Sequence, residues 1–243
     1  DDLTTPPVPD ESLPLQVLYE DADVVVVNKP QGQACHPLRA GETGTVASAV
    51  VARFPSCAQA AQPVREGGVC HRLDTDTSGV LLFAKTPTAW QLLRADFAEG
   101  RIDKEYLALV VGNPTDDEFD VTLPLLSGRN GSPKMQVATT PEEIYHPAAL
   151  DAHTCFSVEQ RGPEHTLLRV IAKTGRRHQI RAHLSHLGLP IVGDPIYGQS
   201  EPGGQFLHAS RLTFPSPSQP ERRIHVDAPL PADRAALLAK LTP

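Results

Sequence analysis

The sequence CHRLDTDTSGVLLFA, which runs from Cys70 to Ala84, places a cluster of charged and hydroxyl residues directly before an uncharged apolar run. The run from Val80 to Ala84 is short and rich in aliphatic and aromatic side chains, which predicts a strand buried on both faces. Asp74 is then expected near the edge of the core, where a carboxylate is unfavourable unless a positive group pairs with it. The pattern predicts a reactive loop resting on a buried strand, although the same residue types also form ordinary turns.

Further elements are predicted on both sides of this strand. Four consecutive valines at 24–27 predict a second buried strand. A helix is expected from Thr45, as its N-terminal cap, to Phe54, and Pro87 is expected to begin an amphipathic helix that ends near Gly100. The other expected elements are strands over 101–111, 151–158, 165–173 and 206–214, with a final helix after residue 231.

The stretch TGRRHQIRAHLSHLG at 174–188 predicts one more helix, with Thr174 as its cap and Gly188 at its end. Helical geometry gives it a buried stripe of Ile180, Leu184 and Leu187, with Arg177, Arg181 and Ser185 beside that stripe. The guanidinium of Arg181 is expected to be half-buried and available to a carboxylate. The histidines at 178, 183 and 186 do not share one face and have no acid in the helix, so no metal site is expected.

Composition points to a folded protein that does not enter a membrane. The chain has 243 residues, of which 40% are hydrophobic, which is enough for a substantial core. Cysteines stand at 35, 57, 70 and 155 without metal-ligand spacing, which indicates reduced thiols in a cytoplasmic protein. No apolar run approaches the roughly 20 residues that span a bilayer.

Charge is unevenly distributed along the chain. The net charge is -7, and residues 1–23 alone hold seven acids and no Lys or Arg. Residues 1–14, which contain four prolines, are expected to form a flexible acidic arm. Residues 165–193 hold five Lys or Arg and no acid, so this region is predicted to be a basic patch that can bind phosphates.

Several motifs together resemble one enzyme family. The pattern HRLDxxTSG at 71–79 resembles the signature of the RluA-type pseudouridine synthases, whose invariant aspartate corresponds to Asp74. The patterns NKPxG at 28–32, KxYxA at 104–108 and TGRxHQIRxH at 174–183 are similar to further family motifs, and the last continues as LGxPIxGDxxYG at 187–198. The resemblance spans about residues 17–226.

The resemblance implies an α+β fold, with a central, mostly antiparallel mixed sheet, flanking helices and an active-site cleft that contains Asp74. It implies a single catalytic domain over 15–243, without the small S4-type RNA-binding domain of larger relatives. A monomer is expected.

The implied activity is that of an isomerase that converts a specific uridine of rRNA or tRNA into pseudouridine without a metal or organic cofactor. Asp74 would be the nucleophile, acting on the base or at the sugar, Arg181 would pair with it, and Tyr106 would line the site. Arg72 would fill the space left by the flipped-out base. Lys29 is expected at the domain surface, where it shapes the neighbouring loop. The residues expected to contact RNA are Arg72, His71, Lys29, Arg176, Arg177 and His178.

Two other functions remain open at this point. Asp74-Thr75-Asp76-Thr77 resembles the nucleophile pattern of haloacid dehalogenase-type phosphatases. That pattern should follow an apolar strand and should act with Mg²⁺, whereas here the apolar run comes after it and Asp194 is the only obvious further acid. The second alternative is an RNA-binding module without catalysis. The presence of all three active-site motifs argues against it.

Overall fold

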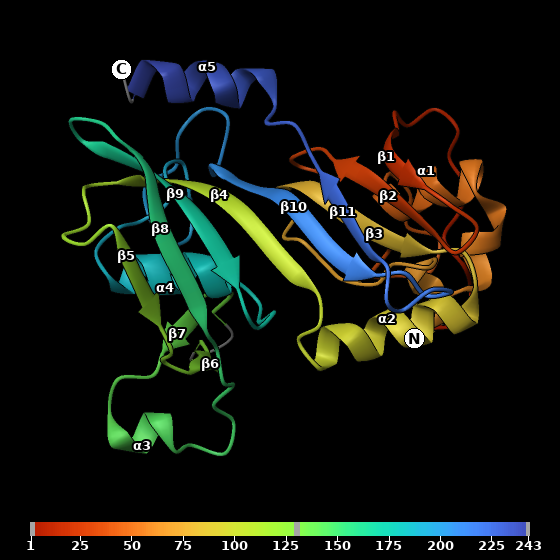
Figure 1. Cartoon of the computed structure of the whole chain (residues 1–243), viewed down its shortest axis with the longest axis horizontal. Helices are drawn as coiled ribbons and strands as arrows, with labels where there is room; N and C mark the ends of the chain where they lie inside the picture. The colour runs from red at the N-terminus through yellow and green to blue at the C-terminus, as the bar shows by residue number, and fades with distance from the viewer. Residues whose placement is uncertain (1–2, 129–131, 242–243) are drawn as a thin grey trace. The chain divides into compact units, whose positions relative to one another are not determined.

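The computed structural model describes residues 3–128 and 132–241, and the chain forms two compact units. One unit comprises residues 1–103 and 209–229, and the other comprises residues 104–208 and 230–243. Strands and helices occur in both units (Figure 1), which confirms the α+β class. Nine of the described strands belong to one large, mostly antiparallel sheet, as predicted, and two more form a separate pair.

The first unit is built on the strand that follows the Asp74 loop. Its strands are β1 (Gln16–Glu20), β2 (Val24–Lys29), β3 (Ser78–Ala84), most of β10 (Leu207–Pro215) and β11 (Arg223–Asp227). Its helices are α1 (Val46–Arg53) and α2 (Pro87–Ala98), with short 3-10 turns η1 (Pro55–Gln59) and η2 (Val64–Glu66). The strand order is β1-β2-β3-β10, with β11 on β10. β2 and β3 run antiparallel in a register that pairs Val24 with Ala84 and Lys29 with Gly79.

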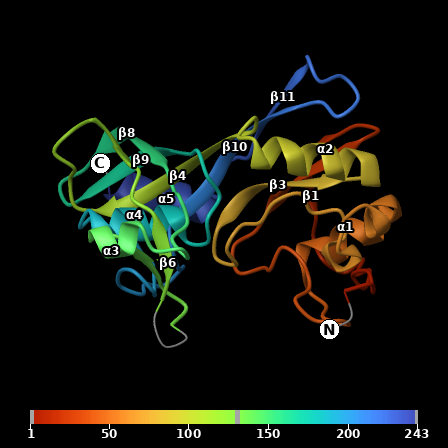
Figure 2. The same cartoon turned by 90° about the horizontal axis from the view of Figure 1, so that it is seen from below.

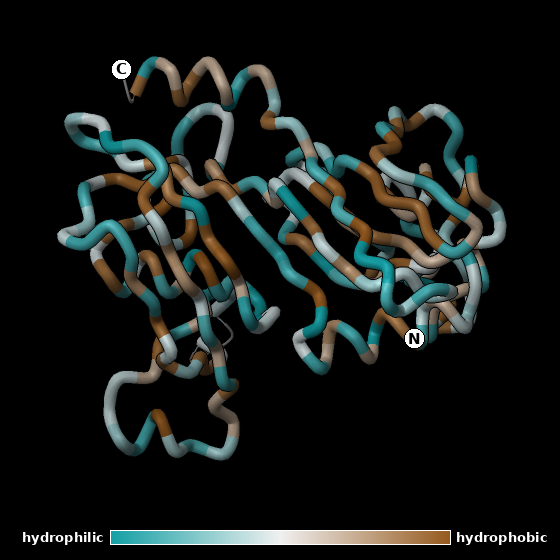
Figure 3. The backbone as a smooth tube through the Cα atoms, in the orientation of Figure 1, coloured by the Kyte–Doolittle hydropathy of each residue, from teal (hydrophilic) through white to brown (hydrophobic). Residues whose placement is uncertain are grey.

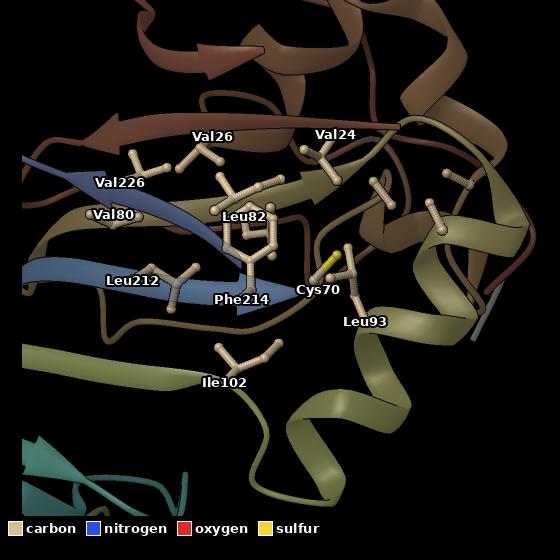
Figure 4. Packing of buried hydrophobic residues seen from close by; sticks show 14 of the residues in the cluster. Val24, Val26, Cys70, Val80, Leu82, Leu93, Ile102, Leu212, Phe214 and Val226 are labelled. Atoms are coloured by element: carbon tan, nitrogen blue, oxygen red, sulfur yellow. The ribbon is translucent and has the colours of Figure 1, made fainter. Parts of the chain in front are cut away.

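Strands β2 and β3 are buried on both faces because a helix covers each side. Figure 2 shows α1 and α2 on opposite sides of β3, and Figure 3 shows hydrophobic stretches along the strands of this unit. One face packs with Leu93 of α2 (Figure 4) and consists of Val24, Val26, Val80 and Leu82. The other face packs with Val50 of α1 and consists of Val25, Val27, Leu81 and Phe83. Since each such side chain contributes roughly 1.5–3 kcal/mol when fully buried, the strand below the Asp74 loop is rigidly supported.

The N-terminal segment 3–14 contacts the rest of the first unit at a few residues. The backbone N–H of Asp10 donates to the carbonyl oxygen of Ser48 over 3.1 Å, and that of Arg65 donates to the carbonyl oxygen of Leu3 over 3.3 Å. Pro7 is buried. The acidic segment is therefore tied to α1 and η2 at these points.

The second unit carries the basic stretch. Its strands β4 (Asp103–Val111), β9 (His165–Ala172), β8 (Thr154–Arg161) and β5 (Glu118–Val121) follow one another in that order, and β6 (Leu125–Ser127) and β7 (Met135–Val137) form a separate antiparallel pair. Its helices are α3 (Pro141–Ile144), α4 (Gln179–His186) and α5 (Ala232–Leu241). Leu125, Met135, Ala152, Ala182 and Tyr197 form a core cluster that joins α4 to this pair. Among the described residues, no helix is long and apolar enough to cross a membrane.

The prediction for the start of α4 was wrong. The helix begins at Gln179, not after Thr174, and its cap residue is His178. Thr174 does not cap, because its hydroxyl donates to the side-chain oxygen of Gln179 over 2.6 Å. Arg177 therefore lies in the preceding turn rather than on the helix face beside Arg181. Strands β5, β6 and β11 and helix α3 are elements that the sequence pattern did not predict.

Candidate active site

Asp74 lies on a tight turn in the first unit, just before β3. The backbone N–H of Thr77 donates to the carbonyl oxygen of Asp74 over 3.0 Å, and the Asp74 residue is half-buried. Within β3, Gly79 is required sterically, because a Cβ there would collide with the backbone of Ala209. The turn thus lies at the end of a strand whose backbone packs closely against Ala209 of β10.

The buried side chain of Lys29 holds the Asp74 turn through a hydrogen bond to its backbone. Its side chain is fully buried, and Nζ donates to the carbonyl oxygen of Thr75 over 2.7 Å and to that of Pro30 over 2.9 Å. Burial lowers the pKa of Lys29 to about 8, while the nearby carboxylates of Asp76 and Asp74 favour its charged form. The expected surface position of Lys29 was therefore wrong, since its ammonium holds the loop from within the unit.

Cys35 holds the other side of the same turn. Its thiol donates to the carbonyl oxygen of Leu73 over 3.3 Å, and the backbone N–H of Leu73 donates back to the sulfur over 3.3 Å. Burial raises the pKa of the Cys35 thiol, which keeps it protonated and able to donate. Together Lys29 and Cys35 bind the residues that precede and follow Asp74.

The two residues before Leu73 differ in their surroundings. Nε2 of His71 accepts a hydrogen bond from the backbone N–H of Leu82 over 3.1 Å, so this nitrogen carries no proton. The ring of His71 also lies 4.9 Å from that of Phe97. Arg72 is exposed, so its guanidinium lies at the protein surface. His71 thus has a clear structural role, and Arg72 lies where an RNA strand could reach it.

Arg181 forms a buried ion pair in the second unit. Its Nε donates to Oδ2 of Asp194 over 2.7 Å and its Nη2 donates to Oδ1 over 2.8 Å, and both side chains are at most 5% exposed. Burial alone would raise the pKa of Asp194, but hydrogen bonds from Arg181 and from the backbone of Ile196 and Tyr197 hold it below the usual value. Asp194 therefore fixes the guanidinium in one bidentate orientation.

Tyr197 connects this ion pair to the β6–β7 pair. The guanidinium carbon of Arg181 lies 5.2 Å from the centre of its ring, and the ring of His178 meets it edge-on at 5.7 Å. The backbone N–H of Met135 donates to the Tyr197 hydroxyl over 2.6 Å, and Nδ1 of His178 lies 3.2 Å from that hydroxyl. The phenol thus orders both Arg181 and the residue at the start of α4.

The turn before α4 depends on contacts far apart in the sequence. His178 has φ 53° and ψ 17°, a left-handed conformation that is uncommon for a residue other than glycine. The side-chain amide of Gln179 donates to the carbonyl oxygen of His153 and to the hydroxyl of Thr154, at 3.0 and 2.9 Å. Arg177 donates from Nη2 to the carbonyl oxygen of Pro133 over 2.7 Å. Arg176 and Arg177 are both exposed.

His183 is a structural residue of α4. Its Nε2 lies 3.0 Å from the carbonyl oxygen of Leu123, which can only accept, and its Nδ1 lies 2.9 Å from the hydroxyl of Thr154. Burial lowers the pKa of His183, so the ring is neutral. Both ring nitrogens are engaged by the fold, which leaves neither for another ligand.

Tyr106 lies on β4, opposite Val170 of β9, and is 9% exposed. The structure therefore groups Asp74 with Lys29, His71 and Arg72 in the first unit, and Arg181 with His178 and the two exposed arginines in the second. The pairing of Asp74 with Arg181 joins residues of different units and stays a prediction. The sequence did not reveal the roles of Asp194, Tyr197 and Cys35, although Asp194 and Tyr197 stand in the quoted GDxxYG motif.

Comparisons with known proteins agree with these motifs. The RNA pseudouridylate synthase family matches residues 23–186. The chain is 35% identical to the uncharacterized RNA pseudouridine synthase YlyB of Bacillus subtilis, over 95% of this chain and 74% of that protein. It is 36% identical to ribosomal large subunit pseudouridine synthase D of Xanthomonas campestris, over 95% of this chain and 70% of that protein. The human RNA pseudouridylate synthase domain containing 1 shares the fold, with a TM-score of 0.72 at 24% identity over 95% of this chain and 96% of that chain.

The chain belongs to the RNA pseudouridylate synthase family. Its relatives identify it further as an RluA-type RNA pseudouridine synthase, and hence as an isomerase.

Proposed function

We propose that this protein isomerises a specific uridine of rRNA or tRNA and that Asp74 is the catalytic carboxylate. The observation that carries the proposal is the placement of Asp74, on a turn clamped by Lys29 and Cys35 at the end of a fully buried strand. Such a carboxylate is positioned before the substrate arrives, as catalysis by a fixed group requires.

The reaction needs no group from outside the chain and the RNA. The N1–C1′ glycosidic bond breaks, the uracil turns, and its C5 bonds to the same sugar carbon. C5 then loses a proton and N1 carries one, so the atoms balance. The carboxylate of Asp74 drives cleavage either by adding covalently or by abstracting a sugar proton.

Arg181 and Tyr106 complete the proposed site. A guanidinium near Asp74 would keep the carboxylate ionised and oriented, because an opposite charge favours the charged form. The ion pair with Asp194 supports this role, since it aims the guanidinium in advance. Tyr106 would stack on or hydrogen-bond the uracil and help to take the proton from C5.

The substrate uridine must leave its base stack to reach Asp74. The exposed Arg72 would occupy the vacated space, and the exposed Arg176 and Arg177, with His178 beside them, would contact the RNA. Similarity to proteins named large subunit pseudouridine synthase D favours rRNA over tRNA as the target. We also propose that the protein acts as a monomer in the cytoplasm.

The test compares two aspartates of the same turn. Asp74→Asn should lower pseudouridine formation on in vitro transcribed large-subunit rRNA by on the order of a thousandfold or more, with an unchanged melting temperature. Asp76→Ala should keep substantial activity. Mapping of pseudouridines in RNA from cells with and without the gene would identify the uridine. Equal loss in the two variants, or activity of Asp74→Asn, would contradict the assignment.

A further inference from the structure

Lys104 occupies an unusual position at the start of β4. Its Nζ donates to the carbonyl oxygen of Thr174, over 3.1 Å, in the turn that precedes α4. The residue is half-buried, and it stands two positions before Tyr106. Since side chains at i and i+2 of a strand point to the same face, Lys104 and Tyr106 share one face of β4, with Cα atoms about 6.5–7 Å apart.

Among the described residues, the charged side chain that acts on this ammonium is also a cation. Burial lowers the pKa of Lys104 to about 8, and the nearby guanidinium of Arg176 acts in the same direction. Arg176 uses its Nε to donate to the carbonyl oxygen of Asp151 over 2.9 Å, which is a neutral acceptor. Among residues 3–128 and 132–241, no carboxylate forms an ion pair with either cation. A partly buried ammonium beside a second cation, with no counter-ion, is unfavourable unless a ligand supplies the negative charge.

Gly175 leaves room for such a ligand above the ammonium. A Cβ at Gly175 would lie 3.2 Å from Nζ of Lys104, and apart from its chain neighbours no other heavy atom lies within 4 Å of that point. Gly175 is exposed and does not have a positive φ, so backbone conformation does not demand glycine here. The absent side chain opens a path from solvent to the ammonium.

We propose that Lys104, Arg176 and the bare backbone at Gly175 form a binding site for one phosphate of the RNA substrate. This proposal rests on the proposed function, because it takes RNA as the ligand. A phosphodiester oxygen would occupy the space over Gly175, accept from Nζ of Lys104 and from the terminal nitrogens of Arg176, and neutralise both. Because Lys104 and Tyr106 share a face, the phosphate would belong to a nucleotide next to the target uridine.

The test measures binding of a 20-nucleotide oligouridylate as a function of salt. Each lost phosphate contact lowers the slope of log Kd against log salt by about 0.7 for a single strand. Lys104→Gln and Arg176→Gln should each lose about that slope and bind roughly tenfold more weakly. Lys104→Arg, which keeps the charge, should retain most of the slope. Lys240→Gln, at an exposed lysine of α5, is the matched control and should bind like the wild type.

Gly175→Ala separates the ligand site from a purely structural role of Lys104. It keeps both cations and introduces no backbone strain, but it fills the space over Nζ, so binding should weaken while the melting temperature stays within a few degrees. On rRNA transcripts, the Lys104 and Gly175 variants should raise KM more than they lower kcat. If Lys104→Gln does not fold, Arg176→Gln and Gly175→Ala decide the matter.

The outcomes distinguish this proposal from the one on which it rests. Unchanged slopes and affinities in these variants, with a wild type that forms pseudouridine, would overturn the phosphate site alone. A wild type that neither binds the RNA nor modifies rRNA would overturn the proposed function.

Discussion

Lys29 in the first unit and Lys104 in the second are similar in local structure and opposite in electrostatic surroundings. Each donates from Nζ to a loop carbonyl oxygen, that of Thr75 and that of Thr174, and burial lowers the pKa of each to about 8. Lys29 has Asp74 and Asp76 nearby, whereas within the described part of the chain the charged side chain that acts on Lys104 is the cation Arg176. The first loop is therefore neutralised from within its unit, and the second is left to be neutralised by a ligand.

The largest expected effect on stability comes from Arg181 of α4, whose charge is paired with that of Asp194. Arg181→Met would leave the buried carboxylate of Asp194 without its partner, which should lower the free energy of unfolding by about 3–5 kcal/mol. Arg181→Lys should recover little, because an ammonium does not reproduce the bidentate contact. The coupling energy between Arg181 and Asp194 should exceed about 2 kcal/mol. It is obtained from the urea midpoints of the wild type, Arg181→Met, Asp194→Asn and the double variant. Additive effects would show that the ion pair does not form.

The pH dependence of stability should reveal the buried Lys29. The unfolded lysine holds its proton up to a pKa near 10.5, whereas the folded one loses it above about 8, so the unfolded state binds more protons in between. The contribution of Lys29 to stability is therefore greatest above pH 10.5 and is lost as the pH falls towards 8. Relative to Lys29→Met, the wild type should gain on the order of 2 kcal/mol between pH 8 and pH 9.5. Parallel profiles of the two proteins would contradict the burial of this ammonium.

A smaller effect is expected where Tyr197 joins the second unit's ion pair to its β6–β7 strands. Tyr197→Phe keeps the ring beside Arg181 but leaves the buried N–H of Met135 without its acceptor, which should cost about 1–2 kcal/mol. Activity should fall less than in Arg181→Met, since the ion pair with Asp194 is retained. Thermal unfolding and pseudouridine assays compare the stability and activity of Tyr197→Phe with those of Arg181→Met. A Tyr197→Phe protein as stable as the wild type would argue against the hydrogen bond from the Met135 N–H to the Tyr197 hydroxyl.

The smallest expected effect tests whether the two units share a site. If Arg181 reaches Asp74 as proposed, Asp74→Asn and Arg181→Met should show a coupling in unfolding free energy of up to about 1 kcal/mol. The value is modest because Asp194 already accounts for two nitrogens of the guanidinium. Strict additivity would mean that Asp74 and Arg181 do not meet.

Much of the local structure was predictable because it depends on short stretches of sequence. The apolar runs at 24–27 and 80–84 predicted β2 and β3, and both are fully buried. Thr45 was expected to cap α1, and its side chain accepts from the backbone N–H of Ser48 as expected. Pro87 begins α2, and β8 and β9 lie where strands were predicted. The motif around Asp74 also led directly to the family.

Other features depend on residues far apart in the chain, and only the tertiary structure decided them. Helix α4 begins at Gln179 rather than after Thr174 because the Gln179 side chain donates to His153 and Thr154, at the start of β8. Lys29 is buried because Thr75, 46 residues away, supplies an acceptor for its ammonium. Asp194 is the partner of Arg181 through two hydrogen bonds that the spacing of the two residues in the sequence does not reveal. Sequence patterns report periodicity and local hydrogen bonding, whereas the partner of a buried charge is set by which distant groups the fold brings within about 3 Å.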